Sequence, residues 1–316
     1  MTVFSAVSFT LSAQDDIIRK INEYGRFDSW CQREIKESGL IGGATEYLYE
    51  FYGCPTDTLR NGREPYQAPE GYVWRTNNVL AIVAGIVKTN NTVYPEKRAD
   101  GYCARLETHI EEVKVMGMIN MDVTCQGAIM VGQLPEPITT TKDPMSKVLY
   151  GFPFTECPKA VRMDYKADVG HEVIRGTGFS RLKAMGYADS AEITVMLQKR
   201  WEDEEGNVHA LRVGTAIERI SESIPDWVNG HELVIGYGDI TSEPYYKDYM
   251  GLKTDPETAY HAINSKGKNV IIQEEGWAPV GTKPTHMMIH AISSCGKAFY
   301  GGVGNTLWLD NIEVVM

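Results

Sequence analysis

The chain has 316 residues, of which 43% are hydrophobic and 23% are charged. This hydrophobic content is ample for a sizeable core, and the ordinary charged fraction argues against wholesale disorder. The formal net charge is −11 and no basic cluster offsets it, so nucleic acid, which needs patches of Lys and Arg, is a poor partner.

The first segment, 2–13, carries no charge and ends in Ser-Ala before Gln14 and an acidic pair. An apolar segment followed by small residues is typical of the h-region and cleavage site of a secretory signal peptide, although no basic residue follows Met1. We therefore expect residues 1–13 to be a truncated signal peptide and the protein to be exported to the periplasm, the cell surface or the medium. The alternative is an edge strand. No other apolar run approaches the roughly 18 residues of a membrane span.

Residues 14–78 are expected to form a helical and irregular lead that packs on the remainder of the chain. Apolar residues early in the lead recur at helical spacing and predict one short helix that ends at Gly25. These residues are Ile17, Ile18, Ile21 and Tyr24. Residues 53–78 are rich in Gly, Pro, Asn and Thr and predict an irregular loop.

From residue 79 onward, short segments with β-branched or alternating residues recur between turn-rich stretches. The segments are 79–87, 101–110, 113–124, 126–133, 159–167, 191–201, 207–217, 231–238, 268–274, 284–293 and 305–315. Many short strands without amphipathic helices between them favour a sandwich, jelly roll or barrel over a βαβ fold.

Two of these strands carry a charged row opposite an apolar row, because alternate side chains of a strand share a face. One strand contributes Arg105 and Glu107 to this row, and the other contributes Arg162, Asp164 and Lys166. The row can be a solvated outer face with weak ion pairs. It can also line a groove, since planar donors and acceptors suit sugar hydroxyls.

Trp277 is the aromatic residue that we expect to contact a sugar. It follows Glu274-Glu275-Gly276 at the end of a strand, where binding residues on a rigid scaffold concentrate. Tryptophan also fills β cores, so a packing role is the alternative.

No catalytic motif of the GxSxG or HExxH kind and no glycine-rich loop that opens a helix is found. A glycosidase needs two carboxylates, and Glu107 and Asp164 are the candidates because they lie on matching polar faces. His286 and His290 share a strand face but lie roughly 13 Å apart at the usual rise, so they are not expected to hold one metal ion.

Several stretches resemble the putative carbohydrate metabolism domain family of exported bacterial proteins. The N-terminal ones are Phe27, Asp28 and Trp30, then Asn91-Thr-Val-Tyr-Pro95 and Gly101 to Thr108. The middle ones are Phe152-Pro-Phe154, Pro158-Lys-Ala160 and Asp164-Tyr-Lys166. The C-terminal ones, the most specific, are Ser293-Ser294, Gly301-Gly302, Gly304 to Leu307 and Leu309-Asp310-Asn311-Ile312. The resemblance covers the chain from about residue 20 to its end.

The resemblance implies an all-β fold: an antiparallel jelly-roll sandwich over 79–316, similar to carbohydrate-binding modules and to some glycanase sandwiches. Such jelly rolls often hold a structural calcium ion between an early carboxylate and one in the last strand, here Asp28 and Asp310. The family more often has Glu where Asp28 stands and Asp where Asn311 stands. Both departures reduce the charge or reach of such a site. The alternative is that Asp310 and Asn311 close a turn.

Three functions follow as hypotheses. The first is an exported protein of glycan utilisation that binds an oligo- or polysaccharide through Arg105, Arg162, Lys166 and Trp277. The second is a glycoside hydrolase that adds the carboxylate pair Glu107 and Asp164, with one raised pKa. The third is a structural or adhesive surface module without a sugar site, which predicts no concave pocket.

Overall fold

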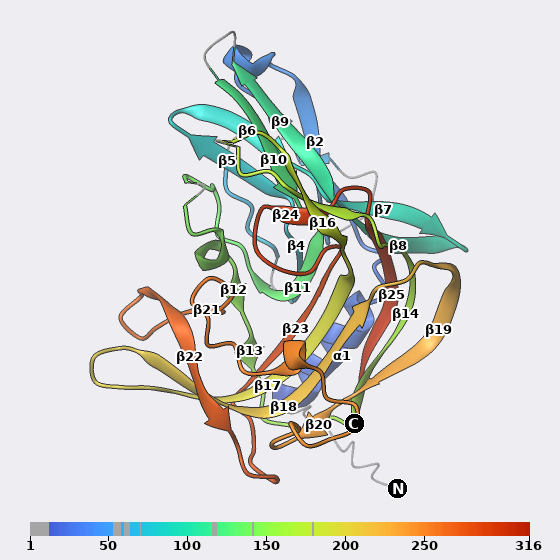
Figure 1. The fold of residues 1–316 in the computed structure, drawn as a ribbon, viewed down its shortest axis with the longest axis vertical. Helices are drawn as coiled ribbons and strands as arrows, with labels where there is room; N and C mark the ends of the chain where they lie inside the picture. The colour runs from blue at the N-terminus through green and yellow to red at the C-terminus, as the bar shows by residue number, and fades with distance from the viewer. Residues whose placement is uncertain are drawn as a thin grey trace, which may run out of the picture.

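The computed structural model describes residues 13–52, 58–59, 64–69, 71–115, 119–140, 142–178 and 180–316. Within these ranges the chain forms β-strands and one α-helix, α1 (Ala13–Tyr24) (Figure 1). The predicted all-β sandwich is confirmed. The signal-peptide prediction falls almost wholly on residues 1–12, which lie outside these ranges. Among the described helices, none is long and apolar enough to cross a membrane.

One layer of the sandwich is an antiparallel five-stranded sheet in the order β19-β14-β25-β8-β7. Its strands are β19 (Ile224–Val234), β14 (Ala160–Asp168), β25 (Thr306–Val315), β8 (Gly101–Glu107) and β7 (Val93–Arg98). β25 lies at the centre of this sheet although it comes last in the chain. It pairs with β14 on one side and with β8 on the other.

The other layer is a larger sheet in the order β13-β23-β17-β18-β22-β21-β12-β11-β4, with β20 beside β18. Its strands are β13 (Phe152–Pro153), β23 (His286–Ile292), β17 (Ala191–Glu202), β18 (Val208–Ile220), β22 (Asn269–Trp277), β21 (His261–Ile263), β12 (Leu149–Tyr150), β11 (Ala128–Gln133), β4 (Trp74–Thr76) and β20 (Gly236–Tyr237). β23 also pairs with β11. The strands β11, β12, β21, β22, β18, β17 and β23 therefore pair in turn and return to β11 as a closed ring.

The main core lies between the two sheets and takes every second side chain from each strand. β17 contributes Ile193, Val195 and Leu197 to it, and β14 contributes Val161 and Met163. Because successive side chains of a strand point to opposite faces, the remaining residues of β17 point into the ring. The ring has its own smaller apolar cluster. Its members are Met196, Val208, Ala210, Ile217, Tyr260, Ile272 and Met288.

The remaining strands form ribbons and small sheets around these two layers. They are β1 (Cys31–Lys36), β2 (Thr45–Glu50) and β3 (Thr58–Leu59); β5 (Val79–Val83) with β6 (Ile86–Asn90); β9 (His109–Val115) with β10 (Ile119–Cys125); and β15 (Glu172–Arg175), β16 (Lys183–Ala188) and β24 (Tyr300–Gly302). Three 3-10 turns are η1 (Gly39–Ile41), η2 (Pro144–Lys147) and η3 (Asp248–Met250).

The N-terminal lead is more regular than its composition indicates. α1 confirms the predicted short helix, but β1 and β2 form a hairpin and β4 pairs with β11 of the large sheet. A cluster of Ile35, Leu48, Leu80 and Val87 joins this hairpin to β5 and β6. The lead and the sandwich therefore share secondary structure and apolar contacts across residue 79.

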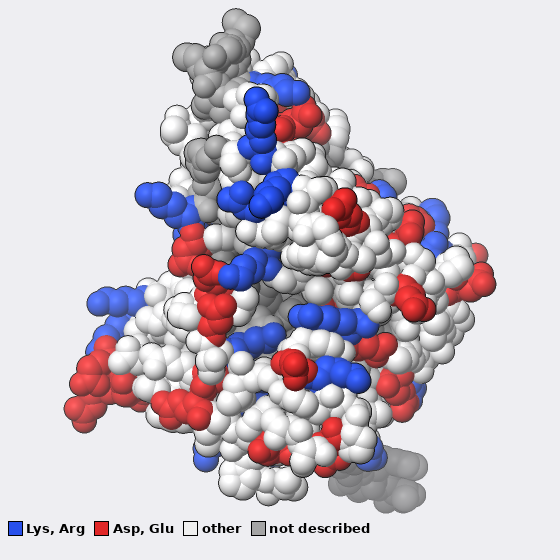
Figure 2. Space-filling model, in the orientation of Figure 1, with Lys and Arg blue, Asp and Glu red and all other residues white. Residues whose placement is uncertain are grey.

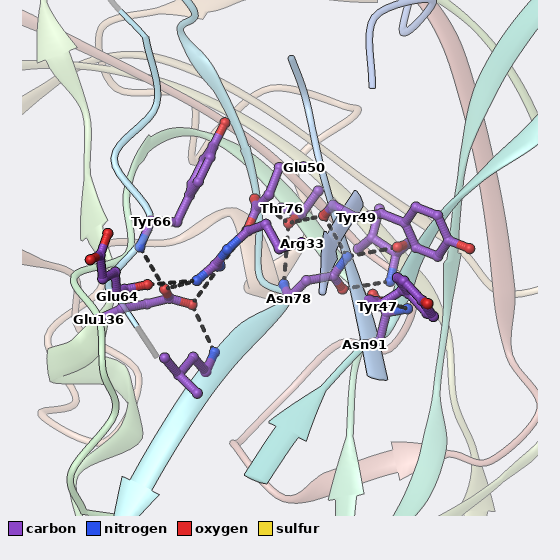
Figure 3. A network of polar contacts seen from close by, with 12 residues as sticks. Arg33, Tyr47, Tyr49, Glu50, Glu64, Tyr66, Thr76, Asn78, Asn91 and Glu136 are labelled. Carbon is purple, nitrogen blue, oxygen red and sulfur yellow. Dashed lines mark hydrogen bonds and ion pairs between the residues drawn. The ribbon is translucent and has the colours of Figure 1, made fainter. Parts of the chain in front are cut away.

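A buried ionic network also ties the lead to the sandwich (Figure 3). Arg33 in β1 donates through Nη1 to Glu50 Oε1 at 2.8 Å and through Nη2 to Glu136 Oε2 at 2.8 Å. Glu136 follows β11 and also accepts the backbone N–H groups of Tyr66 at 2.9 Å and Leu80 at 2.7 Å. The guanidinium of Arg33 thus connects β2 with the segment after β11, which are far apart in the sequence.

Replacing Gly25 by alanine is expected to destabilise the packing of α1 on β25. An added Cβ would lie 2.3 Å from the backbone oxygen of Ile312 and 2.8 Å from that of Ile21, and neither backbone atom can move freely. Overpacking of this kind costs roughly 1–3 kcal/mol of unfolding free energy. Urea denaturation measures the loss. Gly39→Ala is the matched control, because an added Cβ there meets nothing within 4 Å. Equal denaturation midpoints for the two variants would contradict the tight α1–β25 contact.

Candidate functional site

The polar row predicted on two strands lies on the outer face of the five-stranded sheet. β8 contributes Arg105 and Glu107, and β14 contributes Asp164 and Lys166. The strand between them, β25, places Trp308 directly between Lys166 and Arg105, since each of them pairs with it. The structure therefore brings these predicted residues onto one surface.

The cations of this outer face already have partners within the chain. Arg105 Nη1 lies 2.5 Å from Glu107 Oε2, and Lys166 Nζ lies 4.4 Å from the ring centroid of Trp308. Arg162, exposed on the same strand as Lys166, lies 2.6 Å from Glu232. The paired cations and the indole covered by Lys166 leave few groups free for a ligand, and the buried Trp308 Nε1 has no hydrogen-bond partner among the described residues.

Glu107 and Asp164 do not lie opposite each other on this face. β8 pairs Glu107 with Thr306, whereas β14 pairs Asp164 with Asp310. They are thus two strands apart and offset by four residues, roughly 10 Å across and 13 Å along the sheet. Glycosidase carboxyl groups lie roughly 5–9.5 Å apart, so this register does not assemble the expected catalytic pair.

Of the two predicted calcium ligands, Asp28 and Asp310, Asp310 pairs with a guanidinium. Arg98 donates through Nη1 to Asp310 at 2.6 Å and through Nη2 to Asp164 at 2.9 Å. Burial, with a smaller contribution from the charge of Asp28, raises the pKa of Asp310. Asp28 accepts the N–H of Tyr102 at 3.0 Å, and the described residues hold no group of three or more His, Cys, Asp or Glu fit for a metal. Arg98 takes the place of a cation here, so these residues do not fit calcium.

Trp277 lies in the other sheet, at the end of β22, and not beside Arg105 or Lys166. Its ring centroid is 5.6 Å from the guanidinium carbon of Arg212, which belongs to a buried polar cluster inside the ring of strands. The sugar contacts predicted from sequence are therefore divided between two surfaces.

The ring of strands encloses polar and aromatic side chains that sequence analysis did not select. β17, β18 and β23 turn Glu192, Arg219 and His290 to the same face, because Glu192 pairs with Arg219 and His290 pairs with Thr194. The segment 239–264 adds further side chains from above this face. We call the following group the ring site: Tyr150, Glu192, Arg219, Tyr249, Lys253, Tyr260 and His290.

Glu192 and Arg219 form the charged part of the ring site. Arg219 Nε donates to Glu192 Oε2 at 2.7 Å, and Thr194 Oγ1 donates to Glu192 Oε1 at 3.2 Å. The Arg219 guanidinium also lies 4.4 Å from the ring centroid of Tyr249. The Glu192 side chain is 8% exposed and that of Arg219 is 33% exposed, so the arginine is the part that a ligand reaches first.

Tyr150, Tyr260 and His290 form the aromatic part. The ring of Tyr150 lies edge-on to that of Tyr260 at 4.9 Å and 5.1 Å from that of His290. The hydroxyl of Tyr260 is 3.1 Å from His290 Nε2. Burial lowers the pKa of His290 to about 4, so the imidazole is neutral at pH 7 and acts as a polar aromatic surface.

Glu274 holds the backbone of Lys253 in place through a hydrogen bond. Arg212 donates to both oxygens of Glu274, Gln198 donates at 2.6 Å, and the backbone N–H of Lys253 donates at 2.7 Å. Burial alone would raise the pKa of Glu274, but the charge and hydrogen bonds of Arg212 outweigh it and hold that pKa below its usual value. Glu274 is thus an ionised anchor and not a proton donor.

The face of the molecule seen in Figure 2 is hollowed near its centre, where Figure 1 places β11 and β23, and Lys and Arg side chains gather around the hollow. A cavity of about 240 Å³ lies beside the ring site, with Tyr150, Met130 and Ile292 in its wall. The alternation of polar and apolar residues in 191–198 is the signal that could have identified Glu192. It is the same pattern that selected Glu107 and Asp164.

A family model matches most of the chain. It is described as the "Putative carbohydrate metabolism domain" and matches residues 55–315. No curated protein matches the chain.

Two solved structures are similar at low identity. A "putative glycoside hydrolase" from Bacteroides thetaiotaomicron VPI-5482 is 16% identical with a TM-score of 0.43, and the match covers 72% of this chain and 58% of that one. The chain thus spans less than two thirds of that protein's length. A "putative glycoside hydrolase" from Bacteroides vulgatus ATCC 8482 is 16% identical with a TM-score of 0.45, and the match covers 79% of this chain and 89% of that one.

Proposed function

Because this chain belongs to the putative carbohydrate metabolism domain family, its function is related to carbohydrates, and we propose that it is an exported protein that binds a glycan at the ring site. The observation that carries the proposal is a group of buried and half-buried polar and aromatic side chains on the sheet face that points away from the main core. Buried polar groups are costly unless they are paired, so their concentration on one sheet face, beside a cavity that Tyr150 lines, favours a binding role.

The chemistry of the ring site suits a sugar. Sugar hydroxyls both donate and accept, and a carboxylate with a guanidinium offers planar partners of both kinds, as Glu192 and Arg219 do. Tyr249 and Tyr150 supply aromatic surface beside them. Small-molecule sites combine mostly apolar walls with a few convergent polar groups, which is the composition found here.

The same geometry supports binding over hydrolysis. A glycosidase needs a carboxylic acid that keeps its proton, which requires a raised pKa. Glu274 has a lowered pKa, and Glu192 is paired with Arg219 at 2.7 Å. Glu274 therefore does not have the environment of a general acid.

The outer face of the five-stranded sheet is the alternative glycan surface. There Arg105, Arg162 and Lys166 would contact the sugar, at the expense of their present partners. Trp277 lies beside Arg212, which pairs with Glu274 inside the ring of strands. Its effect on a glycan in the ring site would therefore be indirect, through Arg212.

Arg219→Met is expected to weaken glycan binding by roughly 10- to 100-fold, the worth of a charge-assisted hydrogen bond. The measurement is a glycan array on the purified protein, followed by titration of each glycan bound and by analysis for shortened products. Arg162→Met is the matched control, because that arginine lies on the outer face and is exposed. Loss of binding in Arg162→Met alone would move the site to the outer face. Detection of shortened products would show that the protein hydrolyses the glycan and does not only bind it.

A further inference from the structure

The interior of the ring of strands carries more positive than negative side chains. Its cations are Arg200, Arg212, Arg219 and Lys253. The carboxylates that pair with them are Glu192 and Glu274. Among the described residues of this region, four cations therefore face two carboxylates, in a protein whose formal net charge is −11.

Two of the four cations have a carboxylate partner and two do not. Arg212 is paired with Glu274 and Arg219 with Glu192. Lys253 Nζ has only the backbone oxygen of Tyr249, at 3.4 Å, as a partner among the described residues. His290 does not add to the count, since it is neutral at pH 7.

Arg200 is the second cation without a carboxylate. It donates to Gln198 Oε1 at 2.8 Å and to the backbone oxygen of Tyr150 at 3.1 Å, and its buried Nη2 has no partner among the described residues. An added Cβ at Gly151 would lie 2.6 Å from this nitrogen, so backbone packs directly on it. Arg200 contributes positive potential to the interior of the ring, but the backbone at Tyr150 and Gly151 packs on its guanidinium and keeps a ligand from contacting it.

Of the two cations without a carboxylate partner, Lys253 is the one that a ligand can reach. It is half-buried and borders a cavity of about 340 Å³. Burial of the ammonium lowers the pKa of Lys253 and outweighs the charges of Glu192 and Glu274, neither of which forms an ion pair with it among the described residues. A half-buried ammonium without an ion pair costs free energy, and an anionic ligand beside it would reduce that cost.

We propose that the ring site recognises its glycan through an anionic substituent, a carboxylate or a sulfate, that lies against Lys253. This inference rests on the proposed glycan binding and names the class of sugar. The excess positive charge selects acidic over neutral sugars, and Glu274, which accepts the backbone N–H of Lys253 at 2.7 Å, holds the lysine in place.

The test compares glycans that differ only in charge. The probes are an oligogalacturonate, its methyl ester, a chondroitin sulfate oligosaccharide and a neutral cello-oligosaccharide. An acidic probe is expected to bind roughly 10- to 100-fold more tightly than its uncharged counterpart, and added salt is expected to reduce that difference. The oligogalacturonate and chondroitin sulfate arms distinguish a carboxylate from a sulfate.

The lysine is tested with three variants. Lys253→Met should reduce the affinity for the acidic probe to that for the neutral one, whereas Lys253→Arg should retain most of it. Lys266→Met is the control, since that side chain is exposed and bonds to the Glu204 backbone oxygen at 2.8 Å. Equal binding of charged and neutral probes, or an unchanged charge preference in Lys253→Met, would overturn the inference while glycan binding stands. Absence of binding to every glycan would overturn both proposals.

Discussion

Replacement of Arg33 by methionine is expected to lower the free energy of unfolding by roughly 3–5 kcal/mol. The guanidinium is fully buried and donates to both Glu50 and Glu136 (Figure 3). Without it, two carboxylates would remain away from water with no cation between them. Burial already raises the pKa of Glu50 to about 7 with the arginine present, so its ionised form depends on that pairing. Urea denaturation at pH 7 measures the loss.

Rescue variants separate lost charge pairing from lost packing. Adding Glu50→Gln and Glu136→Gln to Arg33→Met removes both stranded charges and is expected to recover at least half of the loss. Arg162→Met is the exposed control and should leave the denaturation midpoint unchanged. A midpoint for Arg33→Met equal to that of the control would show that the network contributes nothing to stability.

Arg212→Met is expected to reduce both stability and glycan affinity. The arginine is fully buried and bonds both oxygens of Glu274, so its removal strands a buried carboxylate at a cost of roughly 3–5 kcal/mol. Glu274 also accepts the backbone N–H of Lys253. Displacement of Glu274 is therefore expected to displace Lys253 from the ring site. Thermal denaturation and titration with an acidic oligosaccharide measure the two effects.

A second variant tests whether the two effects share one cause. The double variant Arg212→Met, Glu274→Met replaces the ion pair with two apolar side chains of similar volume. It is expected to recover at least half of the unfolding free energy that Arg212→Met loses. Glycan affinity should stay low, because no acceptor then remains for the N–H of Lys253. Recovery of both quantities would show that Glu274 does not position the lysine.

The sequence was sufficient to predict the β-rich character and the faces of single strands. The predictions of one strand over 79–87 and one over 113–124 are wrong, because each segment falls on two strands that pair with each other, β5 with β6 and β9 with β10. Alternation placed Arg105 and Glu107 on one face of β8 and Asp164 and Lys166 on one face of β14, and the structure confirms both. Each of these inferences needs only the period of a strand, which is a local property.

Relations between strands were not predictable from one sequence. The irregular character predicted for 53–78 is wrong at β4, whose pairing with β11 depends on residues more than fifty positions away. Trp277 and Arg105 were placed in one site although they belong to different sheets. Lys253 lies in a segment without periodicity, so only the closed ring of strands shows that it lies above Glu274.

The central position of β25 has a consequence for the order of folding. Its neighbours β8 and β14 precede it by well over a hundred residues, and α1 docks on it through the Ile312 N–H to the Gly25 oxygen at 2.9 Å. A growing chain therefore carries α1, β8 and β14 without the strand that joins them until Thr306–Val315 has been made. Contacts between such distant segments form slowly, because loop closure costs entropy before the contacts form. We expect the nascent chain to remain unfolded during most of its synthesis and the core to assemble in a post-translational step.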